Sequence, residues 1–195
     1  PRNHSSAASD VYKRQKVLRM KRGKEGSDRN PFYSSAHNIT VNVESMNVHL
    51  EQDSIVIGQN IVVSRSASNT RRATFESLNY FDSGDYLRMQ NLSSVNPVAI
   101  IAATASRENT NELDADFIAK RINSKYSEEN IQSLLFDLME RGFVSYDDHS
   151  KIINVKDKVF HYADASRKRV DYDGLRIESQ TDSINATLDW KTNEL

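Results

Sequence analysis

The first half of the chain is marked by apolar residues that alternate with polar ones. From Asn38 onwards this period of two recurs in short runs, which Gly, Asn, Ser and Asp residues separate. Such alternation is typical of half-buried antiparallel strands with one apolar face and one face in water. We therefore expect strands at five groups of residues: Ile39, Val41 and Val43; Met46, Val48 and Leu50; Ile55 and Ile57; Ile61 and Val63; Ala73 and Phe75.

A helical section is predicted to follow these strands. Phe81–Asp85 is expected to open a short helix that runs to Gln90. The pair Asn96-Pro97 indicates a second start, because Asn caps helix N-termini and Pro loses no hydrogen bond at the first helical position. This helix is expected to reach about Arg107 and, since it is apolar nearly all round, to be buried.

Two further helices are predicted in the same section. Asp114 is expected to cap a helix that runs to about Asn123. Ser127 is expected to cap the next one, and Gly142 to end it. This last helix carries one apolar stripe, whose burial contributes about 1.5–3 kcal/mol per residue. The stripe consists of Ile131, Leu134, Leu135 and Leu138.

Two short strands, Phe143–Tyr146 and Lys151–Val155, come next, and the Asp-rich turn between them predicts a hairpin. Three helices followed by a hairpin are the order of a winged helix-turn-helix. Period two then returns at Val159–Tyr162, Leu175–Ser179 and Ile184–Trp190. The sequence therefore predicts an α+β fold, in which antiparallel β segments flank a winged-helix-like three-helix module with a β-hairpin.

These patterns also divide the chain into segments. Residues 16–30 are basic and hold two glycines, which favours a linker, with a patch for nucleic acid or lipid head groups as the alternative. The predicted segments are a non-native stretch (1–15), the basic linker (16–30), a β-rich segment (31–92), the winged-helix-like module (93–162) and a second β-rich segment (163–195). The last segment stops at Leu195 inside a β-like pattern, so we expect it to be truncated.

The first residues resemble a translated adapter from transposon-based DNA library preparation. Ser5–Gln15 reads SSAASDVYKRQ, and ordinary codons for that string match one reading frame of the adapter. Such segments are to be left out of fold reasoning. We therefore expect the natural chain to begin near Lys16, inside a longer gene.

Composition excludes some classes of protein. Hydrophobic residues make up 37% and charged residues 27%, which suits a globular protein with a modest core. There are no cysteines, so disulfides, thiolate zinc sites and cysteine nucleophiles are excluded. The longest purely apolar run, Val98–Ala103, is far shorter than the roughly 20 residues of a membrane-spanning helix.

Charge argues against binding of nucleic acid. The whole chain has a net charge of −1, and without residues 1–15 it has −3. Ser94–Val155 holds six basic and ten acidic residues, a net of −4. The third helix, which would enter the major groove, is expected to expose Glu128, Glu129, Gln132, Ser133 and Glu140. Because DNA carries about one negative charge per 1.7 Å, such a face would be repelled.

Four groups of residues are candidates for chemical sites. The histidines (His4, His37, His49, His149 and His161) lack the spacing of a metal motif. Asp147-Asp148-His149 and Asp171-Tyr172-Asp173-Gly174 are both better explained as turns than as acid–base or calcium sites. Arg167-Lys168-Arg169 is expected to be a solvated face or a partner contact. We predict no catalytic, cofactor-binding or metal-binding residue, and no cofactor.

Four stretches together resemble pieces of large, uncharacterised proteins of Bacteroidetes-type bacteria. They are Asn30–Tyr33, Ala73–Ser77, Lys156–Tyr162 and Val170–Asp173. Those proteins resemble long β-repeat proteins of the cell envelope with a short helical insert. The resemblance covers most of residues 30–195 and implies an exported, scaffold-like role. It carries no functional residue over to this chain.

The sequence thus favours a non-catalytic scaffold or protein-interaction segment of a larger bacterial cell-envelope protein. Its partner is expected to be protein, either the remainder of its own parent chain or an envelope partner, and nucleic acid is not expected. The periplasm or cell envelope is favoured over the cytoplasm. The alternative is a winged-helix DNA-binding regulator, which element order alone supports. An enzyme would be favoured by a deep pocket that gathers His37, His49 or His161 with carboxylates.

Overall fold

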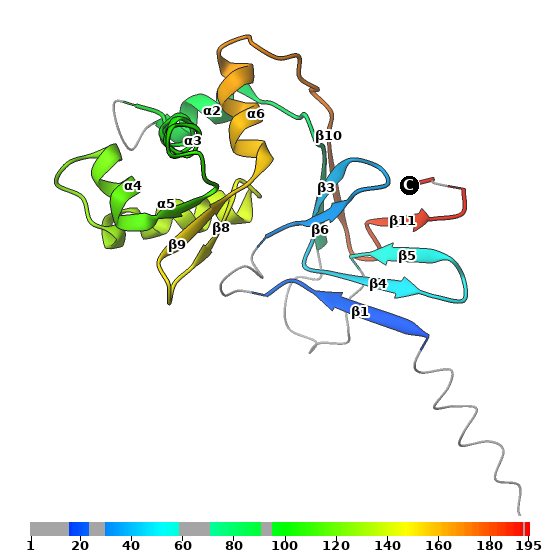
Figure 1. Ribbon diagram of the computed structural model, residues 1–195. Helices are drawn as coiled ribbons and strands as arrows, with labels where there is room; N and C mark the ends of the chain where they lie inside the picture. Colours follow the sequence, from blue (N-terminus) through cyan, green and yellow to red (C-terminus); the bar gives the residue numbers. More distant parts are fainter. Residues whose placement is uncertain (1–15, 24–29, 59–70, 91–94, 193) are drawn as a thin grey trace, which may run out of the picture.

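The computed structural model describes residues 16–23, 30–58, 71–90, 95–192 and 194–195. In this part of the chain five helices and eleven strands form an α+β protein, as predicted (Figure 1). The helices are α2 (Ser83–Met89), α3 (Pro97–Glu108), α4 (Ala115–Ile122), α5 (Glu128–Glu140) and α6 (Asp157–Ser166). The strands are β1 (Val17–Lys21), β2 (Phe32–Ser34), β3 (Ile39–Asn42), β4 (Ser45–His49), β5 (Ser54–Ile57), β6 (Arg71–Ser77), β7 (Glu112–Asp114), β8 (Val144–Asp147), β9 (Ile152–Val155), β10 (Arg176–Thr181) and β11 (Ala186–Asp189).

Two four-stranded antiparallel sheets pack against each other through their apolar faces. Sheet A has the strand order β1-β4-β5-β11, and sheet B has the order β10-β6-β3-β2. Val41 and Phe75 from sheet B join Met46 and Ile57 from sheet A in one buried cluster. Because side chains alternate across a strand, the second face of sheet B carries the polar residues that lie between these apolar ones.

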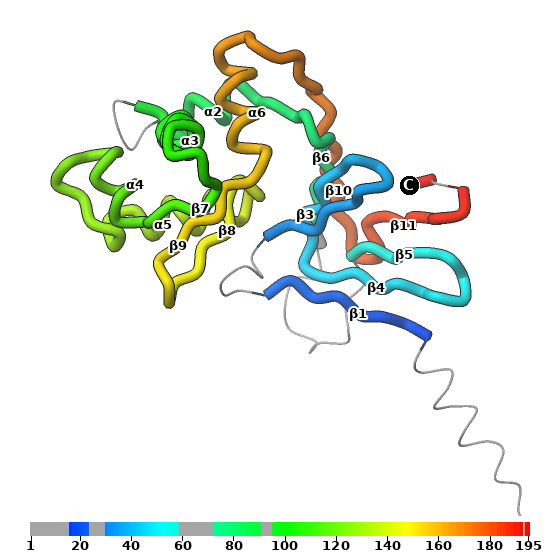
Figure 2. The backbone as a smooth tube through the Cα atoms, in the orientation of Figure 1, coloured from blue at the N-terminus to red at the C-terminus, as the bar shows by residue number. Residues whose placement is uncertain are grey.

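The remaining structure is a helical module, residues 81–166, with its own core. It contains all five helices and a small antiparallel sheet of order β7-β9-β8. The apolar stripe predicted for residues 131–138 is buried here, together with Val98, Ile101 and Tyr162. Figure 2 shows the module and the two sheets as separate groups, connected by the chain between β6 and α2 and by the chain between α6 and β10.

The helix boundaries confirm the capping predictions. Asn96 Oδ1 accepts a hydrogen bond from Val98 N at 2.9 Å, with Pro97 as the first helical residue. Asp114 Oδ1 accepts from Phe117 N at 2.8 Å. Gly142 follows α5 with φ of +77°, the left-handed conformation that favours glycine after a helix. The predicted hairpin is β8 and β9, while β7 is an additional strand that pairs with β9. That this arrangement is a winged helix stays a prediction.

The chain enters the helical module from β6 and returns to sheet B in β10. These two strands are neighbours, and Arg176 lies opposite Glu76 in their register. The module is therefore an insertion between two adjacent strands of one sheet. Phe81 N also donates to Asp173 O at 3.0 Å, so the outgoing and incoming segments are joined just before the module begins.

Two predictions about local structure are wrong. Residues 17–21, expected within a basic linker, form β1, because Leu18 and Met20 lie opposite Val48 and Met46 in sheet A. Residues 159–162, expected as a strand, belong to α6. Val159, Tyr162 and Ala163 are three and four residues apart and are all buried on one side of that helix. The segment boundary predicted at residue 162 therefore falls inside α6.

Some predictions fall outside the described residues. They concern the adapter-like residues 1–15, most of the linker beyond residue 23 and the strand predicted at Ile61 and Val63. Within the described part of the chain, no helix combines the length and the apolar character that crossing a membrane requires.

Candidate functional site

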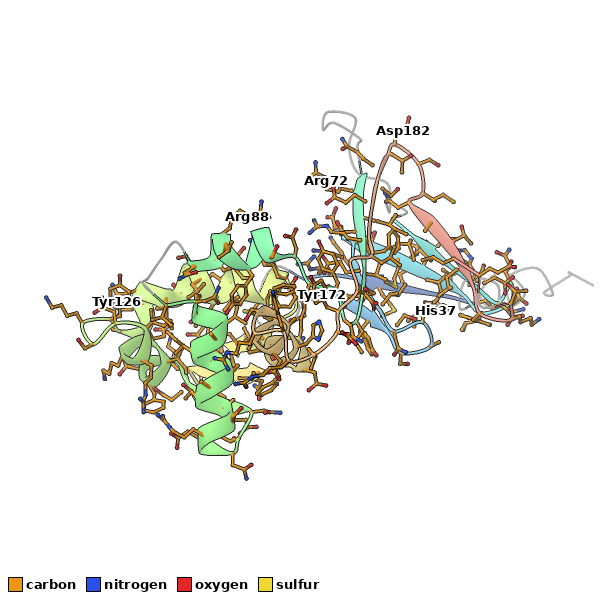
Figure 3. All side chains as sticks on the ribbon, turned by 90° about the horizontal axis from the view of Figure 1, so that it is seen from above. His37, Arg72, Arg88, Tyr126, Tyr172 and Asp182 are labelled. Carbon is orange, nitrogen blue, oxygen red and sulfur yellow. The ribbon has the colours of Figure 1, made fainter. Side chains whose placement is uncertain are left out.

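The polar face of sheet B meets the helical module across a cavity of about 520 Å³, here called the inter-module cleft. Thr74, Glu76 and Arg176 line it from the sheet. Asp85, Arg141 and Lys158 line it from the module. Figure 3 shows Arg72 on the sheet side and Arg88 on the module side, with Tyr172 at the junction between the two parts.

Local sequence places each of these side chains in the cleft. Glu76 alternates with Phe75 in β6, so the apolar ring enters the sandwich and the carboxylate enters the cleft. Asp85 lies in the first turn of α2, whose N-terminus Asp82 caps. Arg141 follows the last residue of α5, and Lys158 is the second residue of α6.

Lys158 links the two parts directly. Its Nζ lies 2.9 Å from Glu76 Oε2 and donates to Arg141 O at 2.9 Å. The side chains of Lys158 and Glu76 are only 12% and 16% exposed, so water screens the pair weakly. The ammonium also lies 5.0 Å from the ring centre of Phe143, within cation–π range.

Arg141 and Arg176 extend this link into a network. Arg141 Nη1 lies 2.7 Å from Asp85 Oδ2, and its Nε lies 3.0 Å from Asp137 Oδ1. Burial opposes the charge of Arg141, but the carboxylates of Asp137 and Asp85 raise its pKa above the ordinary value. On the sheet side, Arg176 Nη1 lies 3.3 Å from Glu76 Oε1.

Of these pairs, Lys158–Glu76 joins the module to the sheet, and the others fix the neighbouring side chains within each part. Each charge in the network faces an opposite charge on another element or on the next turn. The arrangement is therefore suited to fixing the orientation of the module.

Sequence reasoning missed the cleft. The alternation of Thr74 and Glu76 with apolar residues does indicate a polar sheet face, but in an isolated sequence such a face is expected to meet water. The partners Lys158 and Arg141 lie on other elements, and no local pattern links them to Glu76.

The helix expected to meet DNA, α5, differs from its prediction at two positions, since Gln132 is half-buried and Glu128 is buried. Glu128 is 9% exposed and not solvated as predicted, because its carboxylate accepts a hydrogen bond from the hydroxyl of Tyr146. Burial, with a contribution from Glu128, raises the pKa of Tyr146 to about 12. Glu129, Ser133 and Glu140 are exposed, so the outer face of α5 is acidic.

The other sequence candidates lie apart from the cleft. Of the histidines within the described residues, His37 follows β2, His49 ends β4, His149 lies in the β8–β9 turn and His161 lies on α6. The inter-module cleft has no histidine in its lining. Within the described ranges, no three His, Asp or Glu side chains form a group that could hold a metal ion.

The first of the two acidic segments is a turn, as predicted, whereas the second is no turn, because Asp173 forms an isolated bridge with Tyr80. Asp147 Oδ1 accepts from His149 N at 3.0 Å, and this bond lowers the pKa of the Asp147 carboxyl. Asp173 N donates to Asn79 O at 2.8 Å, so the second segment fastens the return from the module. Arg167, Lys168 and Arg169 are exposed.

A second surface lies along the return to the sheets. Every residue from 167 to 178 is exposed. This stretch leads into β10, an edge strand of sheet B. Large apolar side chains are unusually frequent there: Val170, Tyr172, Leu175, Ile177 and, after β10, Ile184. We call β10, together with the exposed side chains of Ile177 and of Leu175 just before the strand, the β10 edge.

Comparison with known proteins identifies no relative. No family model, no curated protein and no solved structure matches the chain.

Proposed function

We propose that this chain is a non-catalytic scaffold and protein-interaction segment of a larger bacterial envelope protein. The inter-module cleft supports the scaffold part, because the Lys158–Glu76 ion pair in it joins two separate cores. The β10 edge supports the interaction part and is the observation that carries the proposal.

The β10 edge combines two features of protein-binding surfaces. Leu175 and Ile177 are 57% and 51% exposed, although both are large apolar side chains whose burial is favourable. The strand also has one side on which no described strand pairs with it. An unpaired strand edge offers backbone hydrogen bonds to an extended partner, and the side chains supply specificity.

The proposal is tested by placing a photo-activated cross-linking amino acid at position 177 of the parent protein in intact cells. We expect cross-links to a defined protein species. The matched control is Ser133, an exposed position on α5. Equal labelling at the two positions, or none at either, would show that the β10 edge is ordinary solvated surface.

The envelope location rests on the resemblance of four sequence stretches to envelope-type proteins. Fractionation of the native bacterium tests it. Recovery of the parent protein with the cytoplasmic proteins would remove this part of the proposal and leave the interaction surface untouched.

A winged-helix DNA-binding regulator remains the second candidate. The order α3, β7, α4, α5, β8, β9 supports it. The acidic outer face of α5 opposes it, because phosphate groups would be repelled where the helix has to enter the groove.

A further inference from the structure

We infer that the partner of the β10 edge is the β10 edge of a second copy of this chain, so that sheet B continues across a two-fold axis. This inference rests on the proposed function and names the occupant of the same surface. It follows from the direction of the free backbone groups and from the order of charges in β10.

The backbone of β10 leaves alternate residues free. Ser77 N donates to Leu175 O at 3.2 Å, and Ile177 is paired with Phe75 in the same register. Because backbone groups of alternate residues point to opposite sides of a strand, the N–H and C=O of Arg176, Glu178 and Gln180 point away from β6. These are the groups that a second strand can use.

Only certain registers join outward-pointing residues of two antiparallel copies. With the axis at Ile177, each Arg176 lies opposite Glu178 of the second copy, and the hydrogen-bonding groups face each other. With the axis at Arg176 or at Glu178, two like charges lie directly opposite, which is destabilising. Of these three registers, the charges therefore favour the one centred on Ile177.

Both faces of the paired strands fit this register. Arg176 and Glu178 lie on one face, where Arg176 Nη2 is already 2.7 Å from Glu178 Oε1. A second copy would complete a ring of four alternating charges. On the other face the two Ile177 side chains become neighbours at a non-hydrogen-bonded pair, where side chains approach closely. Their exposed apolar surface is then covered.

The first test measures the mass of the full chain by light scattering over a series of concentrations. We expect a mass of twice 22.2 kDa for the wild type. Glu178→Arg places like charges opposite each other twice, so we expect dimerisation to weaken about tenfold or more. Glu129→Arg makes the same charge change on α5 and should leave the mass unchanged.

Mixing provides the decisive control. Arg176→Glu should weaken self-association in the same way as Glu178→Arg. A mixture of the two variants restores both opposite-charge pairs and should form a mixed dimer. Loss of folding in either variant cannot produce this rescue. Glu178→Pro is a further variant, since it removes an outward N–H without removing a bond to β6, and it should abolish dimerisation while the circular dichroism spectrum is retained.

Each outcome separates this inference from the proposed function. A wild-type chain that stays monomeric at all concentrations overturns self-pairing, and so does a dimer that Glu178→Arg and Glu178→Pro leave intact. If cross-links from position 177 then lead to a different protein, the interaction surface stands with another occupant. If they lead to no protein, the proposed function fails as well.

Discussion

Replacement of Lys158 by methionine tests whether the ion pairs of the inter-module cleft stabilise the fold. The ammonium donates to the Glu76 carboxylate and to Arg141 O, both at 2.9 Å. Lys158→Met keeps most of the aliphatic stem beside Phe143 and removes the charge. It leaves the Glu76 carboxylate 16% exposed, with Arg176 at 3.3 Å as its remaining cation.

Two known ranges set limits on the expected loss of unfolding free energy. A hydrogen bond to a charged group contributes about 1.5–3 kcal/mol, and breaking a fully buried ion pair costs about 3–5 kcal/mol. Residual exposure and the remaining Arg176 place Lys158→Met near the lower range, at about 2 kcal/mol of unfolding free energy. For a chain of 195 residues this corresponds to a decrease in Tm of roughly 4–8 °C.

Urea unfolding followed by circular dichroism measures this loss. Lys120→Met is the control, because Lys120 and Asp116 form a surface pair with exposed fractions of 60% and 43%. Because water screens this pair, the loss for Lys120→Met should be much smaller than that for Lys158→Met. Combining Lys158→Met with Glu76→Gln should cost about 1 kcal/mol less than the sum of the single changes. Additive losses, or a Lys158→Met variant as stable as Lys120→Met, would refute the role of the pair.

Three further outcomes are expected. Gly58→Ala should lower the unfolding free energy by about 1–3 kcal/mol, because Gly58 has φ of +86° and the added Cβ would lie 1.9 Å from Asn185 Oδ1. Gly174→Ala is the control, because no atom lies within 4 Å of the added Cβ. Urea unfolding should show no comparable loss for this variant. Folding raises the pKa of Tyr146 from 10.0 to about 12, so the unfolding free energy should fall as the pH rises between these values. Tyr146→Phe should flatten this decrease. An unchanged dependence on pH would show that Tyr146 is not its cause. The fluorescence anisotropy of labelled duplex DNA at low salt should stay constant as the protein is added. Saturable binding that added salt abolishes would instead support the DNA-binding regulator.

The sequence predicted elements whose signals are local. Asn96 and Pro97 mark the start of α3 and Gly142 the end of α5 through contacts with residues one to four positions away, so a linear pattern contains them. The hairpin of β8 and β9 was predicted for the same reason. The strand prediction for Val159–Tyr162 was wrong because four residues fit a period of two and a period of 3.6 about equally well.

The cleft and the β10 edge could not be predicted in this way. Lys158 and Glu76 are 82 positions apart, and only the pairing of β10 with β6 brings the module over the polar face of sheet B. β1 likewise could not be predicted, because its sequence is basic and its strand conformation depends on pairing beside Val48 and Met46. Such features depend on tertiary pairing, which hydrophobic alternation leaves undetermined.

The position of the helical module also makes the protein divisible at one place. Its two ends meet on β6 and β10, and neighbouring strands lie only about 4.8 Å apart. A two-residue Asn-Gly turn can span that gap. A gene that joins Ser77 to Leu175 through such a turn keeps Glu76 opposite Arg176 and would encode the sandwich alone. The module is thus a cassette, and the same junction can accept a different domain whose termini lie equally close together.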